Sequence, residues 1–412
     1  MARTPLLLIS ALLDCEPFAA FAFSCDSSRR ISVLFAAPCS RDVNSEKMQH
    51  CARLAAFAFS PQSKQAVQIL VRQHSQDAMG KVGGDMKKAS AIALTAIVLA
   101  MPANGQDSIA KQLAVRIELH SIPSLTLSDE QFLKGDSAAG KPVVVSGELR
   151  IAQGSGRLPV VVLIHGSSGM GANIDFWTRE LNEMGVSTFA LDGFTGRGLT
   201  NVNPDQASLG RLNMILDVYR MLDVLSKHPR VDASRIVLMG FSRGGQGTLF
   251  ASVKRFQQMW NRSGIDFAGY IPFYPDCTTT YRGDTDVADR PIRIFGGVAD
   301  DYNPVAACKA YVERLRVAGR DVTLTEYPNA PHAFDNALLG PTPVVLKNAQ
   351  TVRRCRIRED EAGRLLNAAT DRPFTYQDEC VERDPHVGYD AAATEAARQS
   401  VRAFLRALFK LD

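Results

Sequence analysis

The chain has 412 residues, of which 46% are hydrophobic and 22% are charged. This composition is typical of a globular protein with a large core, and it excludes collagen-like, coiled-coil and wholly disordered chains. The 47 basic and 43 acidic residues leave a formal net charge of +4 without a basic stripe, so a nucleic-acid partner is not indicated. No apolar run reaches the roughly 20 residues of a membrane span, so we expect no stable membrane insertion.

Residues 86–105 have the pattern of a secretory signal peptide. Met86 is followed by two lysines and then by an uncharged apolar stretch from Ala89 to Ala103. Small residues, Ala103 and Gly105, stand where a signal peptidase cleaves. A buried core helix is the alternative, but it would not be uniformly apolar directly after two lysines. We therefore expect a periplasmic or secreted protein.

Residues 1–85 precede a segment that has to be N-terminal in order to act, and they show no sustained helical or strand period. Our hypothesis is that translation starts at Met86, so that residues 1–85 are either not part of the native protein or a disordered leader. The mature protein is then expected to be a single domain, residues 106–412. Peptides from residues 1–85 in the native precursor would contradict this hypothesis.

Four cysteines fall in the expected mature region, and an even number in an exported chain suggests two disulfides. Three pairings are possible, and proximity along the chain favours Cys277–Cys308 and Cys355–Cys380. Four free buried thiols are the alternative. A reductant should lower the stability of the protein if disulfides form, and should leave it unchanged if they do not.

The same region alternates strand and helix patterns. Alternating or continuous apolar runs predict strands at 115–123, 143–152, 159–165, 186–192, 235–239, 267–274, 292–296 and 322–327. Apolar residues at helical spacing predict helices at 176–185, 209–228, 244–258, 304–318 and 391–411. This order indicates an α/β fold, a mostly parallel sheet with helices on both faces. We interpret residues 336–389 as an irregular insertion that carries two of the cysteines.

The sequence GFSRGG at 240–245 lies between a predicted strand and a predicted helix. A G-x-S-x-G pattern in this setting is a nucleophile elbow, a tight turn whose glycines let the serine stand above the sheet. The N-terminus of the following helix favours negative charge that develops there. Ser242 is therefore the candidate nucleophile, and it needs a base that is oriented by a third group.

This kind of elbow requires an acid and then a histidine further along the chain. The loop after the strand at 292–296 carries Asp300 and Asp301, and the loop after the strand at 322–327 carries His332. The other histidines lie in the leader, in predicted elements or in the insertion, apart from the one at the first loop, so His332 is the best base. Either aspartate could instead cap the following helix, and His332 could be a surface histidine.

The oxyanion hole of this fold uses the amide N–H after the nucleophile and one from the first strand–helix loop. These correspond to Arg243 and, in the sequence HGSSG at 165–169, to Ser167. Arg197, in a glycine-rich loop after another strand, is a candidate for binding an acidic substrate group, although an Asp–Arg pair that pins the turn is an equal alternative. Tyr274 ends a strand at the same edge of the sheet and is a further candidate for substrate binding.

These motifs together resemble the dienelactone hydrolase family of α/β-hydrolases. The resemblance covers about residues 140–335 and the final helix, and it rests on the segments HGSSG, DGFTGRG, MGFSRGG, GGVADDYNP and YPNAPHAFD. The acid of the family lies in a G-x-x-D-x-x-x-P pattern, which identifies Asp300 rather than Asp301. The family implies hydrolysis of esters or lactones through an acyl-enzyme. Its enzymes named for dienelactone usually carry cysteine where this chain has Ser242, which argues against dienelactone itself as the substrate.

We therefore expect a serine hydrolase that cleaves a small-molecule carboxylic ester, lactone or thioester. No cofactor is required, and the sequence shows no metal-ligand spacing. The alternatives are a serine peptidase of the oligopeptidase type, which usually brings a propeller or cap domain, and a non-catalytic binding protein on a hydrolase fold. The sequence does not define the oligomeric state.

Overall fold

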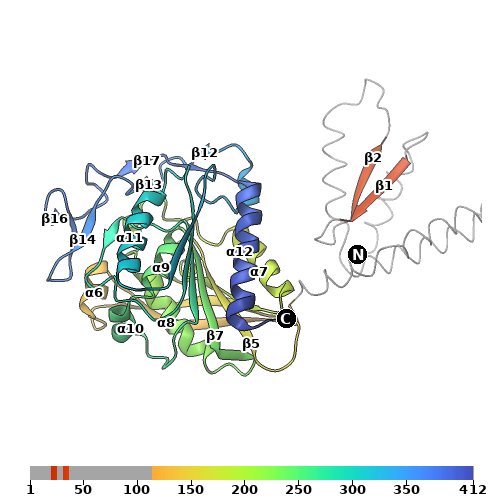
Figure 1. Ribbon diagram of the computed structural model, residues 1–412, viewed down its shortest axis with the longest axis horizontal. Coiled ribbons are helices and arrows are strands. Elements are labelled where there is room, and N and C mark those ends of the chain that lie inside the picture. The colour runs from red at the N-terminus through yellow and green to blue at the C-terminus, as the bar shows by residue number, and fades with distance from the viewer. Residues whose placement is uncertain (1–19, 26–30, 37–113, 412) are drawn as a thin grey trace, which may run out of the picture. The chain divides into compact units, whose positions relative to one another are not determined.

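The computed structural model describes the side chains of residues 114–411 and the backbone of two short N-terminal stretches. The chain divides into two compact units, Met1–Ile109 and Ala110–Asp412. In the first unit, strands β1 (Ala20–Cys25) and β2 (Ile31–Ala36) pair antiparallel (Figure 1). The expected signal peptide lies outside the described residues, so the hypotheses on translation start and export stay predictions.

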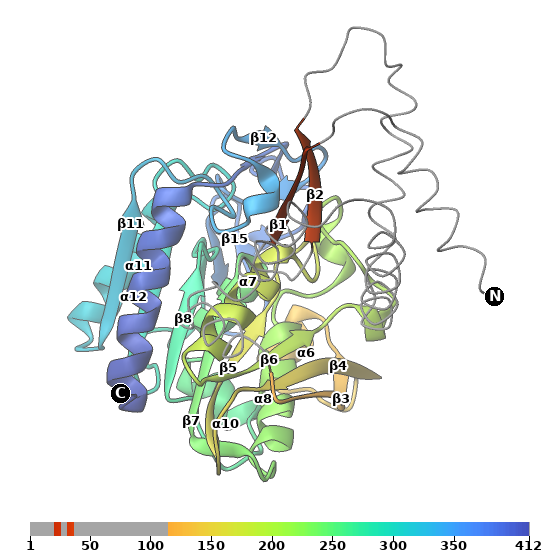
Figure 2. The same cartoon turned by 90° about the vertical axis from the view of Figure 1, so that its right-hand side faces the viewer.

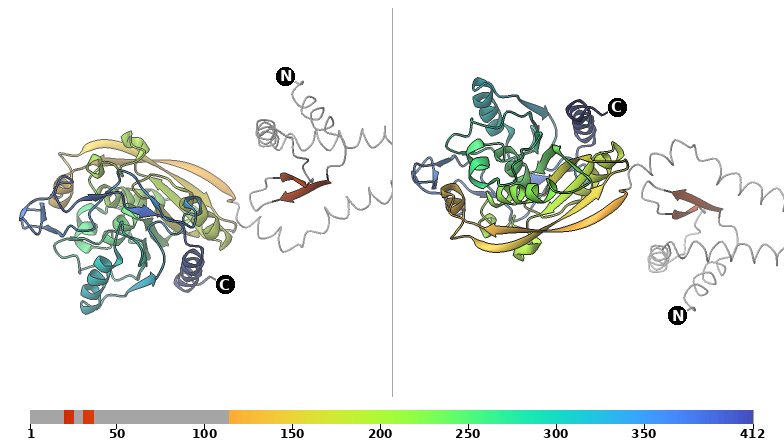
Figure 3. Two further views of the ribbon diagram at one scale, coloured as in Figure 1. Left: turned by 90° about the horizontal axis from the view of Figure 1, so that it is seen from above. Right: turned by 90° about the horizontal axis from the view of Figure 1, so that it is seen from below.

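An eight-stranded sheet forms the centre of the second unit, in the order β11-β10-β8-β7-β5-β6-β4-β3. The six strands from β11 to β6 run parallel, whereas β4 and β3 are antiparallel to their neighbours. Figure 3 shows β3 and β4 at the edge of the sheet opposite to α11. The strands are β3 (Arg116–Thr126), β4 (Lys141–Ile151), β5 (Leu158–Ile164), β6 (Ser187–Asp192), β7 (Val231–Phe241), β8 (Gly269–Phe273), β10 (Ile292–Gly297) and β11 (Val322–Tyr327).

Helices cover both faces of this sheet, as predicted. Alternate residues of β5 point to opposite faces, so that Val160 and Val162 join one core cluster while Val161 and Leu163 join the other. The first face packs against α6 (Asp129–Lys134), α8 (Asn213–Leu225), α9 (Arg243–Phe250), α10 (Lys254–Trp260) and α11 (Val305–Val317). The second packs against α7 (Ala172–Glu183) and α12 (Ala391–Phe409), which both face the viewer in Figure 2.

The helix predicted at 244–258 is two helices, α9 and α10. Val253 between them has an extended backbone, with φ −67° and ψ 119°, and forms an isolated β-bridge with Val287. The N–H of the next residue, Lys254, donates to the carbonyl of Asp286. The segment around Asp286 and Val287 thus takes up backbone hydrogen bonds that a continuous helix would use. The spacing of apolar residues along the chain does not reveal this long-range contact.

The insertion at 336–389 contains more regular structure than predicted. Its short elements are η3 (Ala337–Leu339), β12 (Val344–Val345), β13 (Gln350–Thr351), β14 (Ile357–Glu359), β15 (Leu365–Asn367), β16 (Arg372–Pro373), β17 (Glu382–Arg383) and β18 (His386–Val387). They form small sheets, one of which includes β9 (Thr279–Thr280) from outside the insertion. Figure 1 shows β12, β13 and β17 along the upper side of the second unit.

Two disulfides join the pairs that chain proximity favoured. Cys355–Cys380 closes the insertion on itself, and Cys277–Cys308 ties the loop after β8 to α11. Of the described helices, none is both long and apolar enough to span a bilayer.

Candidate active site

Ser242 lies in the sharp turn between β7 and α9. Its backbone has φ 55° and ψ −114°, a conformation that side-chain-bearing residues rarely adopt. A Cβ on Gly240 would lie 2.2 Å from the Gly244 carbonyl oxygen, and one on Gly244 would lie 2.4 Å from the Ile164 carbonyl oxygen. Only glycine fits these two positions, and the elbow is held by the Ser242 N–H, which donates to the Phe273 carbonyl at 3.0 Å.

The structure brings Ser242, His332 and Asp300 into one hydrogen-bonded chain. The Oγ of Ser242 lies 2.9 Å from Nε2 of His332, and Nδ1 of His332 lies 2.7 Å from Oδ2 of Asp300. The other carboxylate oxygen of Asp300 accepts the N–H groups of Tyr302 and Asn303, each at 2.8 Å. These two bonds fix the carboxylate, so Nδ1 of His332 carries the proton and the lone pair of Nε2 faces the serine.

Asp301 points away from His332 and holds the insertion instead. Its carboxylate accepts the backbone N–H of His386 at 2.8 Å and Nδ1 of the same residue at 2.9 Å, and it pairs with Arg353. Burial opposes ionisation here, but the bonds from His386 and the charge of Arg353 hold the pKa of Asp301 below its ordinary value. The geometry therefore selects Asp300 as the partner of His332.

Two tyrosine rings enclose His332, which is 3% exposed. The ring centroids of Tyr274 and Tyr302 lie 4.8 Å and 4.7 Å from that of His332. The hydroxyl of Tyr274 donates to Asp335 at 2.6 Å, and the other oxygen of Asp335 accepts from Trp177 at 2.7 Å. Burial raises the pKa of both Tyr274 and Asp335. The structure thus places Tyr274 in the wall around the histidine, and its contact with substrate stays a prediction.

The two predicted oxyanion residues lie on either side of the nucleophile. A Cβ on Gly166 would lie 3.2 Å from that of Ser242, so the loop that carries Ser167 passes directly over the serine. The N–H of Arg243 belongs to the first turn of α9, where amide groups have no partner within the helix. Both residues bond to one side chain, because Oε1 of Gln206 accepts from the Ser167 hydroxyl at 3.1 Å and from the Arg243 guanidinium at 2.8 Å.

Gln206 is a site residue that the sequence analysis missed. Its side-chain amide also donates to the Tyr302 hydroxyl at 3.0 Å, and its backbone N–H donates to the side chain of Gln350 in the insertion at 2.8 Å. Gln206 lies in the short helix η2 (Gln206–Ser208), in a segment without a motif. Only the folded chain shows that the side-chain amide of Gln206 links Ser167 and Arg243, the two predicted oxyanion residues.

The substrate-binding role predicted for Arg197 is wrong. Its side chain is 3% exposed and forms a two-pronged ion pair with the fully buried Asp217, at 2.7 and 2.9 Å. Its remaining donors bond to the hydroxyl of Thr126 and to the carbonyls of Gly193 and Leu125. All five N–H groups are thereby used inside the protein, and Arg197 pins the loop, as in the alternative reading, with Asp217 as its partner.

His165 braces the same loop. Its Nδ1–H donates to the Gly166 carbonyl at 2.8 Å, and its Nε2 accepts the Gly193 N–H at 3.2 Å. Burial lowers the pKa of His165, so the ring stays neutral, as this pair of bonds requires.

Two hollows meet at Ser242. The smaller has a volume of about 30 Å³ and is lined mostly by polar residues, and the larger has a volume of about 120 Å³ and is lined by both polar and apolar residues. The smaller includes Arg211, Gln246, Asp276, Gln350 and Tyr376. The larger includes His332, Tyr274, Leu339, Leu346 and Val387. The insertion therefore contributes to the walls of both.

A mostly parallel sheet with a serine elbow, followed along the chain by an aspartate and a histidine that meet at its edge, defines an α/β-hydrolase with a serine nucleophile. The family model of the dienelactone hydrolase family matches residues 146–355, and the chain belongs to this family. The protein is thus a hydrolase. No curated protein matches the sequence.

Several solved structures are similar to this chain at low sequence identity. A dienelactone hydrolase-like promiscuous phosphotriesterase from metagenomic libraries shares 16% identity, with a TM-score of 0.46 over 71% of this chain and 98% of its own. Esterase 2 of Thermogutta terrifontis, phosphonylated by cyclosarin, shares 17%, with a TM-score of 0.39 over 47% and 81%. Est1E of Butyrivibrio proteoclasticus with bound ferulic acid shares 17%, with a TM-score of 0.38 over 48% and 90%.

Proposed function

We propose that the protein is a carboxylic ester hydrolase in which Ser242 is the nucleophile, His332 is the general base and Asp300 orients the histidine. The observation that carries this proposal is the unbroken chain of hydrogen bonds, 2.9 Å from Oγ to Nε2 and 2.7 Å from Nδ1 to Oδ2. A serine hydroxyl is a weak nucleophile alone, and a base at hydrogen-bond distance removes its proton as the new bond forms.

The reaction then has two stages. Oγ of Ser242 attacks the ester carbonyl while His332 takes its proton at Nε2, and the imidazolium formed is stabilised by Asp300. The same proton passes to the departing alcohol, which leaves an acyl group on Ser242. A water molecule gives a proton to Nε2 of His332 as it attacks the acyl carbonyl, and His332 then passes that proton to Oγ of Ser242 as the bond to the acyl group breaks, which releases the acid and restores the serine hydroxyl. The amide N–H groups of Arg243 and Ser167 stabilise the negative oxygen in both stages.

The size and lining of the two hollows favour small ester substrates that carry a hydrogen-bond acceptor near the reacting carbonyl. Gln246 lines the smaller hollow, and its side-chain Nε2 is buried without a hydrogen-bond partner among the described residues. An unpartnered buried donor costs free energy that a substrate oxygen recovers on binding. Arg211 and Arg243 line the same hollow, where Arg211 pairs with Asp276 at 3.0 Å and Arg243 bonds to Gln206 and Leu209.

A matched pair of substrates tests this preference. The 4-nitrophenyl esters of methoxyacetic and butyric acid differ by an oxygen in place of a methylene. We expect Gln246→Leu to lower kcat/KM for the methoxyacetate relative to the butyrate by about tenfold. An unchanged ratio would contradict the role of Gln246.

A fluorophosphonate probe tests the proposed activity itself. We expect covalent labelling at Ser242, with labelling lost in Ser242→Ala and in His332→Ala, and turnover of 4-nitrophenyl esters in the unmodified protein. Labelling that persists in both variants would contradict the assignment. Turnover of peptide anilides without ester turnover would favour the peptidase alternative, and neither labelling nor turnover would favour a binding protein.

We also propose that the protein is exported through the signal peptide at 86–105. The two disulfides support this proposal, because such bonds persist in oxidising compartments. Cell fractionation followed by N-terminal sequencing tests it. A mature N-terminus near residue 106 in the periplasm or medium is expected, and an uncleaved cytoplasmic protein would contradict it.

A further inference from the structure

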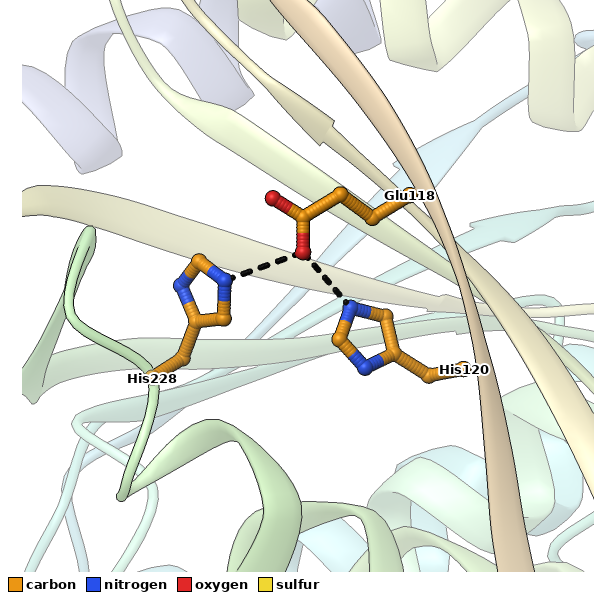
Figure 4. A group of neighbouring side chains, drawn as sticks. All are labelled: Glu118, His120 and His228. Atoms are coloured by element: carbon orange, nitrogen blue, oxygen red, sulfur yellow. Dashed lines mark hydrogen bonds and ion pairs between the residues drawn. The ribbon is translucent and has the colours of Figure 1, made fainter.

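A second group of titratable side chains lies between the edge strand β3 and the end of α8 (Figure 4). Glu118 and His120 are two residues apart on β3, so their side chains share one face of the strand. His228 follows the C-terminal end of α8, 110 residues from Glu118 in the chain. The sequence analysis found no metal-ligand spacing, because only folding brings the third residue to the other two.

The three side chains converge on one carboxylate oxygen. Oε2 of Glu118 lies 3.2 Å from Nε2 of His120 and 3.1 Å from Nε2 of His228. All three atoms lie within 4.8 Å of one another. Two ligands of a tetrahedral Zn²⁺ ion, each bound at about 2.0–2.1 Å, are about 3.3 Å apart. The two distances from Glu118 to the histidines therefore already match the spacing of ligands around a single ion, and the two histidine nitrogens, within 4.8 Å of each other, need only a small movement.

We propose that Glu118, His120 and His228 form a binding site for one Zn²⁺ ion, with water as the fourth ligand. Two imidazoles and a carboxylate form a set of ligands that binds Zn²⁺ in preference to the hard cations Ca²⁺ and Mg²⁺. The side chains are 21%, 18% and 9% exposed, so the group is held in place and still open to an ion and a water molecule.

Neighbouring bonds orient two of these ligands. The other oxygen of Glu118, Oε1, accepts from Arg116 at 2.6 Å, which leaves Oε2 directed at the histidines. Nδ1 of His228 accepts the N–H of Arg230 at 3.2 Å. An ion at Nε2 moves the ring proton to Nδ1, and this long contact is then lost. We therefore expect weaker binding than at a closed site of four cysteines.

This site is distinct from the triad. His228 lies three residues before the start of β7, whereas Ser242 directly follows its end, so the two lie at opposite ends of that strand. An ion bound here fastens β3 to the end of α8. Because it binds only the folded chain, it stabilises the fold by mass action and supplies no chemistry to the ester reaction.

Titration of the tag-free, EDTA-treated protein with ZnCl₂ tests the proposal, read by calorimetry and by thermal unfolding. We expect one Zn²⁺ per chain and a higher Tm. His120→Ala and His228→Ala should each weaken binding at least tenfold, whereas His386→Ala, which removes a histidine from the insertion, should bind as the unmodified protein does. Ester turnover should be the same with and without zinc.

Two further measurements keep the test decisive if an alanine variant fails to fold. Glu118→Gln keeps the size of the side chain and should weaken binding while the protein stays folded. Co²⁺ should give the intense visible absorption of a tetrahedral site in the unmodified protein. Absence of stoichiometric binding by the folded protein, or equal binding by His228→Ala and the unmodified protein, would overturn the proposal.

Discussion

The carboxyl ends of the parallel strands and the insertion at 336–389 line the same two hollows, but different forces hold them. Ser242 follows the buried strand β7, and His332 follows the edge strand β11, whose position is set by its parallel pairing with β10 and by its contacts with the core clusters. The insertion has strands of only two or three residues, and it is fixed by the Cys355–Cys380 disulfide and by partly exposed ion pairs such as Arg353–Asp301. The reacting side chains thus belong to the loops of the large sheet, whereas the walls around them are shared with the insertion.

Adjacent aspartates offer the sharpest test of this division. We expect Asp300→Asn to lower kcat by roughly 10⁴-fold, because the amide no longer holds His332 in the useful tautomer. Asp301→Asn should change kcat less than about tenfold and cost about 1 kcal/mol of stability, because it weakens only the hold on the insertion. Steady-state kinetics and denaturant unfolding of both variants measure this, and equal losses of kcat would break the division.

Substitutions of Arg197 and Arg353 compare the stability that an ion pair contributes beneath the sheet-edge loop with the stability that one contributes in the insertion. Arg197→Ala leaves the buried charge of Asp217 without its partner, and we expect a loss of about 3–5 kcal/mol in the free energy of unfolding. Arg353→Ala in the insertion, where the side chain is 23% exposed, should cost about 1 kcal/mol or less. Urea unfolding gives both values. If Arg197→Ala instead lowers the free energy of unfolding only slightly and raises KM, Arg197 binds substrate after all.

Two glutamines probe the link between the regions. Gln206→Ala removes the acceptor that the Ser167 hydroxyl and the Arg243 guanidinium share. We expect kcat to fall about 10- to 100-fold with little change in KM, as for a residue that positions oxyanion donors. Gln350→Ala removes only the acceptor that the insertion offers to the Gln206 backbone, and its effect on kcat should be smaller. A larger effect from Gln350→Ala would show that the insertion, and not the sheet edge, sets the oxyanion geometry.

The last and smallest expected effect is the contribution of His165 to the pH dependence of the free energy of unfolding. Burial lowers the pKa of His165, so below about pH 6.5 the unfolded chain binds a proton that the folded protein does not. The stability that depends on the neutral ring is therefore present above that pH and is lost as the pH falls, by at most about 1.4 kcal/mol per pH unit. Unfolding from pH 7.5 to 5 should show a shallower slope in His165→Asn, and an identical slope would contradict this account.

The sheet and the Ser242–His332–Asp300 chain were open to prediction because each part has a local signal. β5 reads LPVVVLI, the elbow has its glycines, and parallel strands deliver their following loops to one edge. The break between α9 and α10 had no such signal, since it depends on a bridge to Val287.

The same holds for the residues that long-range contacts assemble. Gln206 acts through Ser167 and Arg243 from a segment without a motif, and His228 meets Glu118 only in the folded chain. The sequence left two roles open for Arg197, substrate binding and an ion pair that pins the loop, because the partner that decides between them, Asp217, lies 20 residues further along the chain.

The most direct measurement is kcat for a 4-nitrophenyl ester in Ser242→Ala, His332→Ala and the double variant, each shown to be folded by its Tm. If the two side chains act as one unit, each single change lowers kcat by at least about 10⁴-fold and the double change lowers it no further. A Ser242→Ala enzyme that keeps its turnover, or a double variant whose loss is the product of the two single losses, would contradict the account.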